Sequence, residues 1–185
     1  MLYVLSENFS TDKIVDAISI CKSDSQKTGA ELRHAHIDLG FALGKYFKNH
    51  FTKDSVIIAL IRAGIPMALG FADCLDCAVT FYDDKTDKDF FEKNKLLLFN
   101  KDVIFVDAVI NSGKGILSAI EKSEIPKDKI KIVTNVLCEK SIKKFNDYEV
   151  FTVRVSNNSF VGQKVLTQKN GIGPDTGDRL FNTLV

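Results

Sequence analysis

The sequence predicts an α/β fold in which helices cover both faces of a parallel, twisted sheet of about five strands. Short apolar runs rich in β-branched and aromatic residues predict buried strands. These runs cover residues 55–61, 78–82, 103–106, 129–137 and 149–155. Helix-spaced apolar residues lie between several of them, for example after residue 62 and after residue 115. Because strands alternating with helices are typical of parallel sheets, we expect a doubly wound core.

The chain of 185 residues is long enough for one domain, which we expect to span residues 1–185. Within it, residues 1–50 form a helical N-terminal part, residues 55–155 the core sheet, and residues 156–185 a tail. A net charge of +1 gives no sign of a nucleic-acid partner. No apolar run approaches ~18 residues, and no basic start precedes the first apolar residues, so we expect no membrane span or signal peptide and a cytoplasmic location.

The N-terminal part is expected to consist of helices that pack, together with the tail, as a small hood over one edge of the sheet. Thr11 or Ser10 could cap a helix that reaches Cys21. A second apolar stripe predicts a helix over residues 30–48, with Arg33 off the stripe and solvated. Residues 1–5 are either an edge strand or a flexible start.

The four cysteines show one suggestive spacing. Cys74 and Cys77 are three apart, as in zinc and redox sites, but Cys21 and Cys138 form no second pair. We therefore interpret all four as free thiols of a reducing compartment.

The run over residues 103–106 ends in Asp107 and is followed by a loop that contains Asn111, Ser112, Gly113 and Gly115. A strand, an acid, a Gly/Ser turn and a helix are the layout of a phosphate-binding loop, because glycine lets backbone amides approach an anion. The P-loop motif is excluded, since Ala108 stands where its first glycine belongs. The dinucleotide-binding glycine pattern is also absent. An ordinary strand-to-helix turn remains the alternative.

Arg62 closes another buried strand, beside Gly64. An arginine there can extend its charge to solvent, or it can bind an anion with bidentate geometry. The charged segment 83–95 is either a surface hairpin or a lid that keeps water from a reactive intermediate.

Three motifs carry a resemblance to a known family. The central loop resembles the signature of type I phosphoribosyltransferases, and Ile61-Arg62-Ala63-Gly64 resembles the Leu-Arg-Ala-Gly turn of uracil phosphoribosyltransferases. The tail resembles the C-terminal motif of the same family and matches it in register at Asp175, Gly177, Asp178, Arg179, Leu180, Phe181 and Thr183. Most type I phosphoribosyltransferases carry two adjacent acids at the end of the central strand, whereas the uracil branch carries one. This sequence also has one acid there, Asp107, which is a further similarity to the uracil branch. The resemblance covers roughly residues 55–185.

The resemblance implies transfer of ribose 5-phosphate from phosphoribosyl pyrophosphate (PRPP) to uracil, with no nucleophilic residue, and a homodimer or larger assembly. It implies a PRPP site formed by Arg62, Asp107, Ala108, Val109, Ile110, Asn111, Ser112, Gly113, Lys114, Gly115 and Asp175, with Lys85 as a further candidate. It implies a uracil site formed by Lys169, Gly173, Pro174, Asp175 and Thr176. It also implies Mg²⁺, bound through the substrate and with Asp175 as a candidate ligand.

The sequence departs from the family at three places. Asp83 follows Tyr82 where the family has an arginine, Pro174 is an insertion or substitution in the tail loop, and Lys114 replaces a small residue. A phosphoribosyltransferase for another base, such as a purine or orotate, is therefore a second hypothesis. A nucleotide-binding regulator of the same fold is a third.

Overall fold

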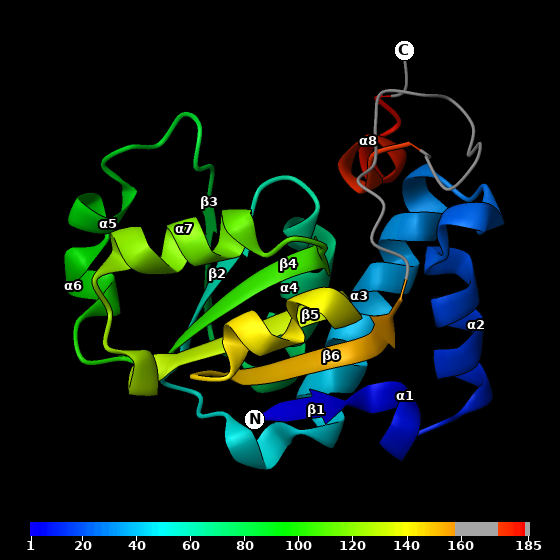
Figure 1. The fold of residues 1–185 in the computed structure, drawn as a ribbon, viewed down its shortest axis with the longest axis horizontal. Helices are drawn as coiled ribbons and strands as arrows, with labels where there is room; N and C mark the ends of the chain where they lie inside the picture. The colour runs from blue at the N-terminus through cyan, green and yellow to red at the C-terminus, as the bar shows by residue number, and fades with distance from the viewer. Residues whose placement is uncertain (158–173, 184–185) are drawn as a thin grey trace.

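The computed structural model describes residues 1–157 and 174–183. A six-stranded parallel sheet forms its centre, in the order β1-β6-β5-β4-β2-β3 (Figure 1). The strands are β1 (Leu2–Val4), β2 (Val56–Leu60), β3 (Ala78–Tyr82), β4 (Val103–Ile110), β5 (Ile130–Cys138) and β6 (Glu149–Ser156). The predicted fold class is confirmed, with six strands in place of about five. The additional strand is β1, which pairs in parallel with β6, so the N-terminus is an edge strand.

Eight α-helices and four 3₁₀ helices accompany the sheet in the described residues. The α-helices are α1 (Leu5–Asn8), α2 (Asp12–Cys21), α3 (Gly29–Tyr46), α4 (Gly64–Leu75), α5 (Phe90–Lys93), α6 (Lys95–Leu98), α7 (Lys114–Ser123) and α8 (Thr176–Phe181). The 3₁₀ helices are η1 (Ser23–Ser25), η2 (Lys48–His50), η3 (Lys127–Lys129) and η4 (Glu139–Phe145). Figure 1 shows α7 on one face of the sheet and α4 on the other.

The strands carry continuous apolar runs because both of their faces are buried. Ile57 and Ala59 pack into a core with α2, α3 and α4, whereas Val56 and Ile58 pack into a second core with α7. Successive side chains of a strand point to opposite faces, so each core takes every second residue. Two separate cores of this kind are what helices on both faces require.

Helices α3 and α4 cross at very short range. A Cβ at Gly40 would lie 2.1 Å from the Met67 carbonyl oxygen, and a Cβ at Gly70 would lie 2.0 Å from the Ile37 carbonyl oxygen. Only glycine leaves room for backbone on backbone at such a crossing. The two glycines therefore fix the position of α4, whose N-terminal end follows Arg62.

The tail helix α8 is fastened to the N-terminal part of the chain. The guanidinium of Arg179 is buried and donates hydrogen bonds to the Lys22 and Lys27 carbonyl oxygens, at 3.1 and 2.9 Å. Arg33 Nη1 donates to the Leu180 carbonyl oxygen at 2.7 Å. The expectation that Arg33 is solvated was wrong, because a carbonyl near the end of α8 needs a donor. These bonds hold α8 against the start of α3 (Figure 1).

Segment 83–95 contains a turn and the short helix α5, so the hairpin alternative was wrong. Phe90 and Phe91 each pack against the Tyr82 ring in a tilted arrangement, with ring centroids 5.1 Å apart. The aromatic cluster anchors the segment at the end of β3, which a charged surface hairpin would not need.

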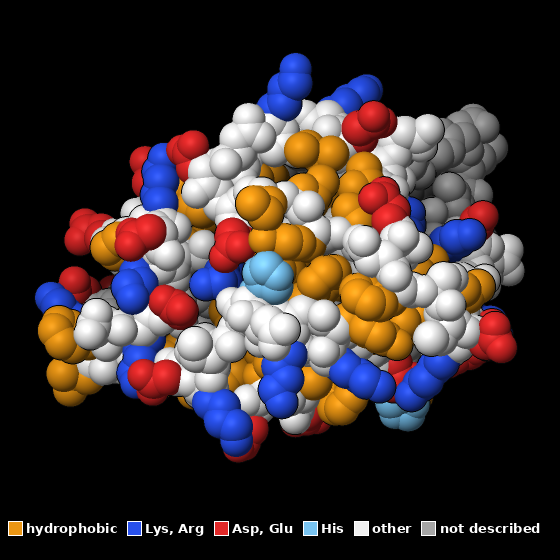
Figure 2. Space-filling model, turned by 90° about the horizontal axis from the view of Figure 1, so that it is seen from below, with side chains coloured by type: hydrophobic (Ala, Val, Ile, Leu, Met, Phe, Trp, Pro, Cys, Tyr) orange, Lys and Arg blue, Asp and Glu red, His pale blue; other side chains and the backbone are white. Residues whose placement is uncertain are grey.

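The end of the molecule away from α8 carries charged side chains of both signs around scattered apolar ones (Figure 2). This mixture agrees with the small net charge. All four cysteines are free, as predicted. Among the helices in the described part of the chain, none has both the length and the apolar character needed to cross a bilayer.

Candidate functional site

The candidate site lies at the carboxyl edge of the sheet, where β2, β4, β5 and β6 end beneath α8 (Figure 1). Parallel strands all end at the same edge, so the loops that follow them meet there. In open α/β sheets this edge is where ligands bind. Residues 62, 107 and 175, far apart in the sequence, are brought to this one edge.

Strand β4 runs further than predicted. The pairs Asp107↔Thr134, Val109↔Val136 and Ile110↔Leu137 continue the ladder with β5 past the acid. Ala108, Val109 and Ile110 therefore belong to the strand and not to the phosphate loop, and Ala108 and Ile110 are buried. The residues after the acid are apolar, so they continue the buried strand. The loop itself consists of residues 111–113.

The loop over residues 111–113 is braced from outside by η4. Ser141 Oγ donates to the Asn111 carbonyl oxygen, and Lys144 Nζ donates to the Ser112 carbonyl oxygen at 2.8 Å. Gly113, with φ +76°, precedes α7, and a Cβ there would lie 2.8 Å from the Phe145 ring. The loop thus has a fixed shape that presents the N-terminus of α7, a site suited to an anion.

The side chains of this loop differ in exposure. Ser112, Lys114 and Gly115 are exposed, and a Cβ at Gly115 would meet nothing within 4 Å. The space in front of α7 is therefore open to a ligand. Lys144 adds a cation that sequence reasoning missed, because two lysines in a short helix are ordinary surface residues.

Arg62 binds the tail. Its Nη2 lies 2.6 Å from Asp178 Oδ1 and its Nη1 donates to Thr183 Oγ1 at 3.0 Å. Thr183 Oγ1 also donates to Asp178 Oδ1 at 2.7 Å, which closes a three-membered network. The Arg62 side chain is still 44% exposed, so part of the guanidinium faces solvent at the site. The Ile61–Arg62 peptide bond is cis.

Asp175 caps α8 next to this network. Its Oδ1 accepts hydrogen bonds from the Gly177 and Asp178 amides, at 2.8 and 3.4 Å. A Cβ at Gly177 would lie 3.0 Å from Asp175 Oδ1 and 3.5 Å from Arg62 Nε. Two of the three sequence motifs that carry the family resemblance, the Arg62 turn and the tail, are therefore in contact.

The predicted acid Asp107 is partly buried and lies within reach of the charge of Asp175. Burial raises the pKa of Asp107 to about 7, against hydrogen bonds from the Ala108 and Val109 amides that lower it, and the charge of Asp175 raises it further. A cation between the two carboxylates would relieve this repulsion. Among the described residues, no group of three or more His, Cys, Asp or Glu side chains could hold a metal ion. Carboxylate oxygens are ligands that Mg²⁺ takes, usually one or two of them in a set completed by substrate and water.

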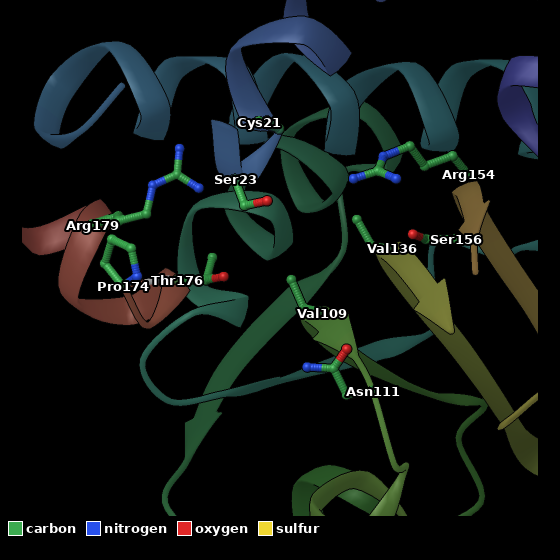
Figure 3. A pocket seen from close by; sticks show the side chains of 10 residues that line it. All are labelled: Cys21, Ser23, Val109, Asn111, Val136, Arg154, Ser156, Pro174, Thr176 and Arg179. Atoms are coloured by element: carbon green, nitrogen blue, oxygen red, sulfur yellow. The ribbon is translucent and has the colours of Figure 1, made fainter. Parts of the chain in front are cut away.

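A cleft opens beside the loop, between the strand ends and the hood (Figure 3). Its cavity volume is about 70 Å³, smaller than the few hundred Å³ of most small-molecule sites. Asn111, Val109, Pro174 and Thr176 line it, as four of the predicted residues. Arg179, a residue of the tail motif, also lines it, and sequence reasoning missed the others, which are Cys21, Ser23, Val136, Arg154 and Ser156.

Cys21 belongs to a buried polar cluster behind this cleft. Its Sγ lies 3.3 Å from His36 Nδ1, and His36 Nε2 lies 3.3 Å from Asn135 Nδ2. Burial raises the pKa of Cys21 to about 12 and lowers the pKa of His36 to about 4. Both groups are therefore neutral at pH 7, so the pair provides no thiolate nucleophile despite its geometry.

One predicted residue, Lys85, is not brought to this site. Lys85 is exposed in the turn after β3, where its amide donates to Asp83 Oδ1 at 3.0 Å, and no hydrogen bond or ion pair within the described residues joins it to the others. Lys169 and Gly173 lie outside the described residues.

The parallel sheet and the turn that leads into α7 agree with the fold of type I phosphoribosyltransferases. The sequence matches the family described as uracil phosphoribosyltransferase over residues 26–183, and the chain belongs to that family. A search among curated proteins finds no match.

Solved structures with a similar fold come from several bacteria. The AQ2163 protein from Aquifex aeolicus has 17% identity and a TM-score of 0.62, with 98% of each chain covered. A hypothetical protein from Neisseria gonorrhoeae with bound ppGpp has 15% identity and a TM-score of 0.52, covering 66% of this chain and 80% of that one. The TT1426 protein from Thermus thermophilus has 13% identity and a TM-score of 0.51, covering 65% of this chain and 83% of that one. At these identities the similarity shows the fold alone.

The raised pKa of Asp107 predicts a pH-dependent stability. The folded value of about 7 lies above the ordinary 3.8, so the stabilising contribution is complete below pH about 4 and is lost as pH rises through 7. In Asp107→Asn, the side chain has nearly the shape of a protonated aspartic acid and stays neutral at every pH. In urea unfolding, the variant should gain stability relative to the wild type between pH 5 and pH 8. A stability difference that is constant over this range would contradict the assignment.

Proposed function

We propose that the protein transfers ribose 5-phosphate from PRPP to uracil and releases pyrophosphate, giving UMP. The observation that carries this proposal is the contact of Arg62 with Asp178 and Thr183, which joins the arginine turn to the tail beside the phosphate loop. Membership in the uracil phosphoribosyltransferase family supports the choice of base.

The phosphate loop would hold the 5-phosphate of PRPP. Ser112, Lys114 and Gly115 are exposed at the start of α7, and the backbone amides of residues 111–115 and the Ser112 hydroxyl would be the donors. An anion there meets both amide donors and the positive end of a ten-residue helix. Binding at this loop would fix the position of the ribose ring.

Asp107 would accept a hydrogen bond from a ribose hydroxyl, and Arg62 would bind the pyrophosphate. Cleavage at the anomeric carbon creates positive charge on the ring and negative charge on the leaving group. The protein's contribution would therefore be positioning and electrostatics, with no covalent intermediate. Asp107 and Asp175 would hold a Mg²⁺ ion through substrate oxygens and water, and the ion would supply neutralisation of the pyrophosphate charge.

The base would enter the cleft of Figure 3, with Pro174 and Thr176 of the tail at its side. The tail residues Lys169 and Gly173 remain proposed contacts. Lys85 also remains a proposed contact for PRPP. The segment after β3 would have to move to bring Lys85 to the substrate. We further propose a single domain, a homodimer or larger assembly, and a cytoplasmic enzyme of pyrimidine salvage, all supported by the family resemblance.

A competition among bases tests the specificity. Equal concentrations of uracil, cytosine, orotate, hypoxanthine and adenine are given to the enzyme with limiting PRPP and Mg²⁺, and the nucleotides are separated by mass. We expect UMP as the main product. A different nucleotide would overturn the choice of uracil but keep the transferase reaction, and no nucleotide at all would overturn the reaction as well.

A further inference from the structure

Arg154 is a charged residue of the cleft that the reaction described above does not use. It lies on β6 opposite Val136 of β5, two residues before the strand ends. Within the described residues, its Nε is buried without a hydrogen-bond partner and its guanidinium makes no ion pair. Figure 3 shows the guanidinium extending from β6 toward the middle of the cleft. A buried donor without a partner is costly, unless a ligand supplies the acceptor.

The second arginine of the cleft provides a contrast. Arg179 has its Nε and Nη2 engaged by the Lys22 and Lys27 carbonyl oxygens and by Ser25 Oγ. These donors of Arg179 therefore bind the N-terminal part of the chain and are not available to a ligand. None of the described residues that line the cleft is acidic. The charge of Asp24, next to the lining residue Ser23, raises the pKa of Arg154, but burial lowers that pKa by more.

We propose that Arg154 is the specificity-determining residue of the cleft, which recognises the oxo group at position 4 of the pyrimidine and rejects an amino group there. The inference rests on the proposed function and specifies how its base is chosen. An arginine carries only donors, so the edge of the base that faces it must carry an acceptor. The amino group of cytosine is also a donor, so the amino group and the Arg154 guanidinium would both lack an acceptor. Two unpaired donors disfavour cytosine more strongly than the loss of one contact would.

The position of Arg154 indicates which edge it would meet. The ribose is expected at the loop after β4, whereas Arg154 projects from β6, two strands away and so roughly 10 Å across the sheet. A pyrimidine attached to the ribose through N1 would extend toward β6, and the ring edge opposite N1 would face Arg154. Position 4 lies at that opposite edge, whereas the oxo group at position 2 lies next to N1.

The test compares equilibrium binding of UMP and CMP, which differ in the group at position 4 and the protonation of N3. The wild type should bind UMP at least tenfold more tightly, as a hydrogen bond to a charged donor allows. Arg154→Met removes every donor and should bring the two affinities within about threefold, mainly by weakening UMP. Arg154→Gln, which can also accept, should narrow the preference too and serves if the Met variant unfolds. Lys45→Met, which removes an exposed cation of α3 outside the cleft, should keep the wild-type preference.

An undiminished preference for UMP in the Met and Gln variants would overturn the proposal, as would an equal loss of affinity for UMP and CMP. Because the readout is binding, it remains informative if the wild type transfers no ribose phosphate. In that case the proposed reaction fails, and the two affinities still decide the role of Arg154.

Discussion

Replacing Asp107 with asparagine is expected to lower kcat/KM for PRPP about a hundredfold. Asparagine keeps the shape of the side chain in the β4–β5 ladder but removes its negative charge. Loss of a charged contact of ~3 kcal/mol in the transition state corresponds to this factor. Steady-state rates of pyrophosphate release at saturating base and varied PRPP provide the measurement.

The matching change at the other side of the site is Arg62→Met, for which we expect a similar decrease. It also removes the bonds to Asp178 and Thr183, so the tail contact must be separated from substrate binding. Thr183→Val removes the hydroxyl from that network and leaves the guanidinium in place. If the Asp107 and Arg62 variants both kept near-normal turnover, neither residue would belong to the active site.

Gly70→Ala is expected to lower the free energy of unfolding by about 3 kcal/mol, at the upper end of the usual cost of overpacking a core. The new Cβ would lie 2.0 Å from the Ile37 carbonyl oxygen, and backbone cannot move aside as a side chain can. Helices α3 and α4 would have to separate along their crossing. Urea unfolding followed by circular dichroism measures the change.

Gly115→Ala is the matched control. It adds the same methyl group within α7, where no atom lies within 4 Å of the new Cβ. Alanine favours the helix over glycine, so this variant should be as stable as the wild type or slightly more stable. Equal destabilisation by both substitutions would show that the α3–α4 crossing is looser than described here.

The central sheet and the turn that leads into α7 could be predicted because their signals are local. A run such as residues 103–106, buried on both faces, has few alternatives to a central strand, and the acid and glycines that follow it have a fixed order. Strand β1 is only three residues long, and its pairing with β6 depends on residues far away in the sequence. A short stretch of sequence does not show which distant strand it will pair with.

The cleft was harder to predict for a related reason. Arg154 reads in the sequence as an alternating charged residue at the end of a strand, and only the packing of α2, η1 and α8 over the strand ends encloses it. Lys144 and Ser141 similarly acquire a role only through their contacts with the loop after β4. The extent of β4 past Asp107 was missed because an acid was taken as the end of the strand.

The most direct test of the account is the release of pyrophosphate from PRPP and Mg²⁺ with and without uracil. We predict release that requires uracil, occurs with an equal amount of UMP, and falls about a hundredfold in Asp107→Asn. Release that proceeds at the same rate without any base, or no release with uracil by a protein that binds PRPP, would contradict the proposed transfer.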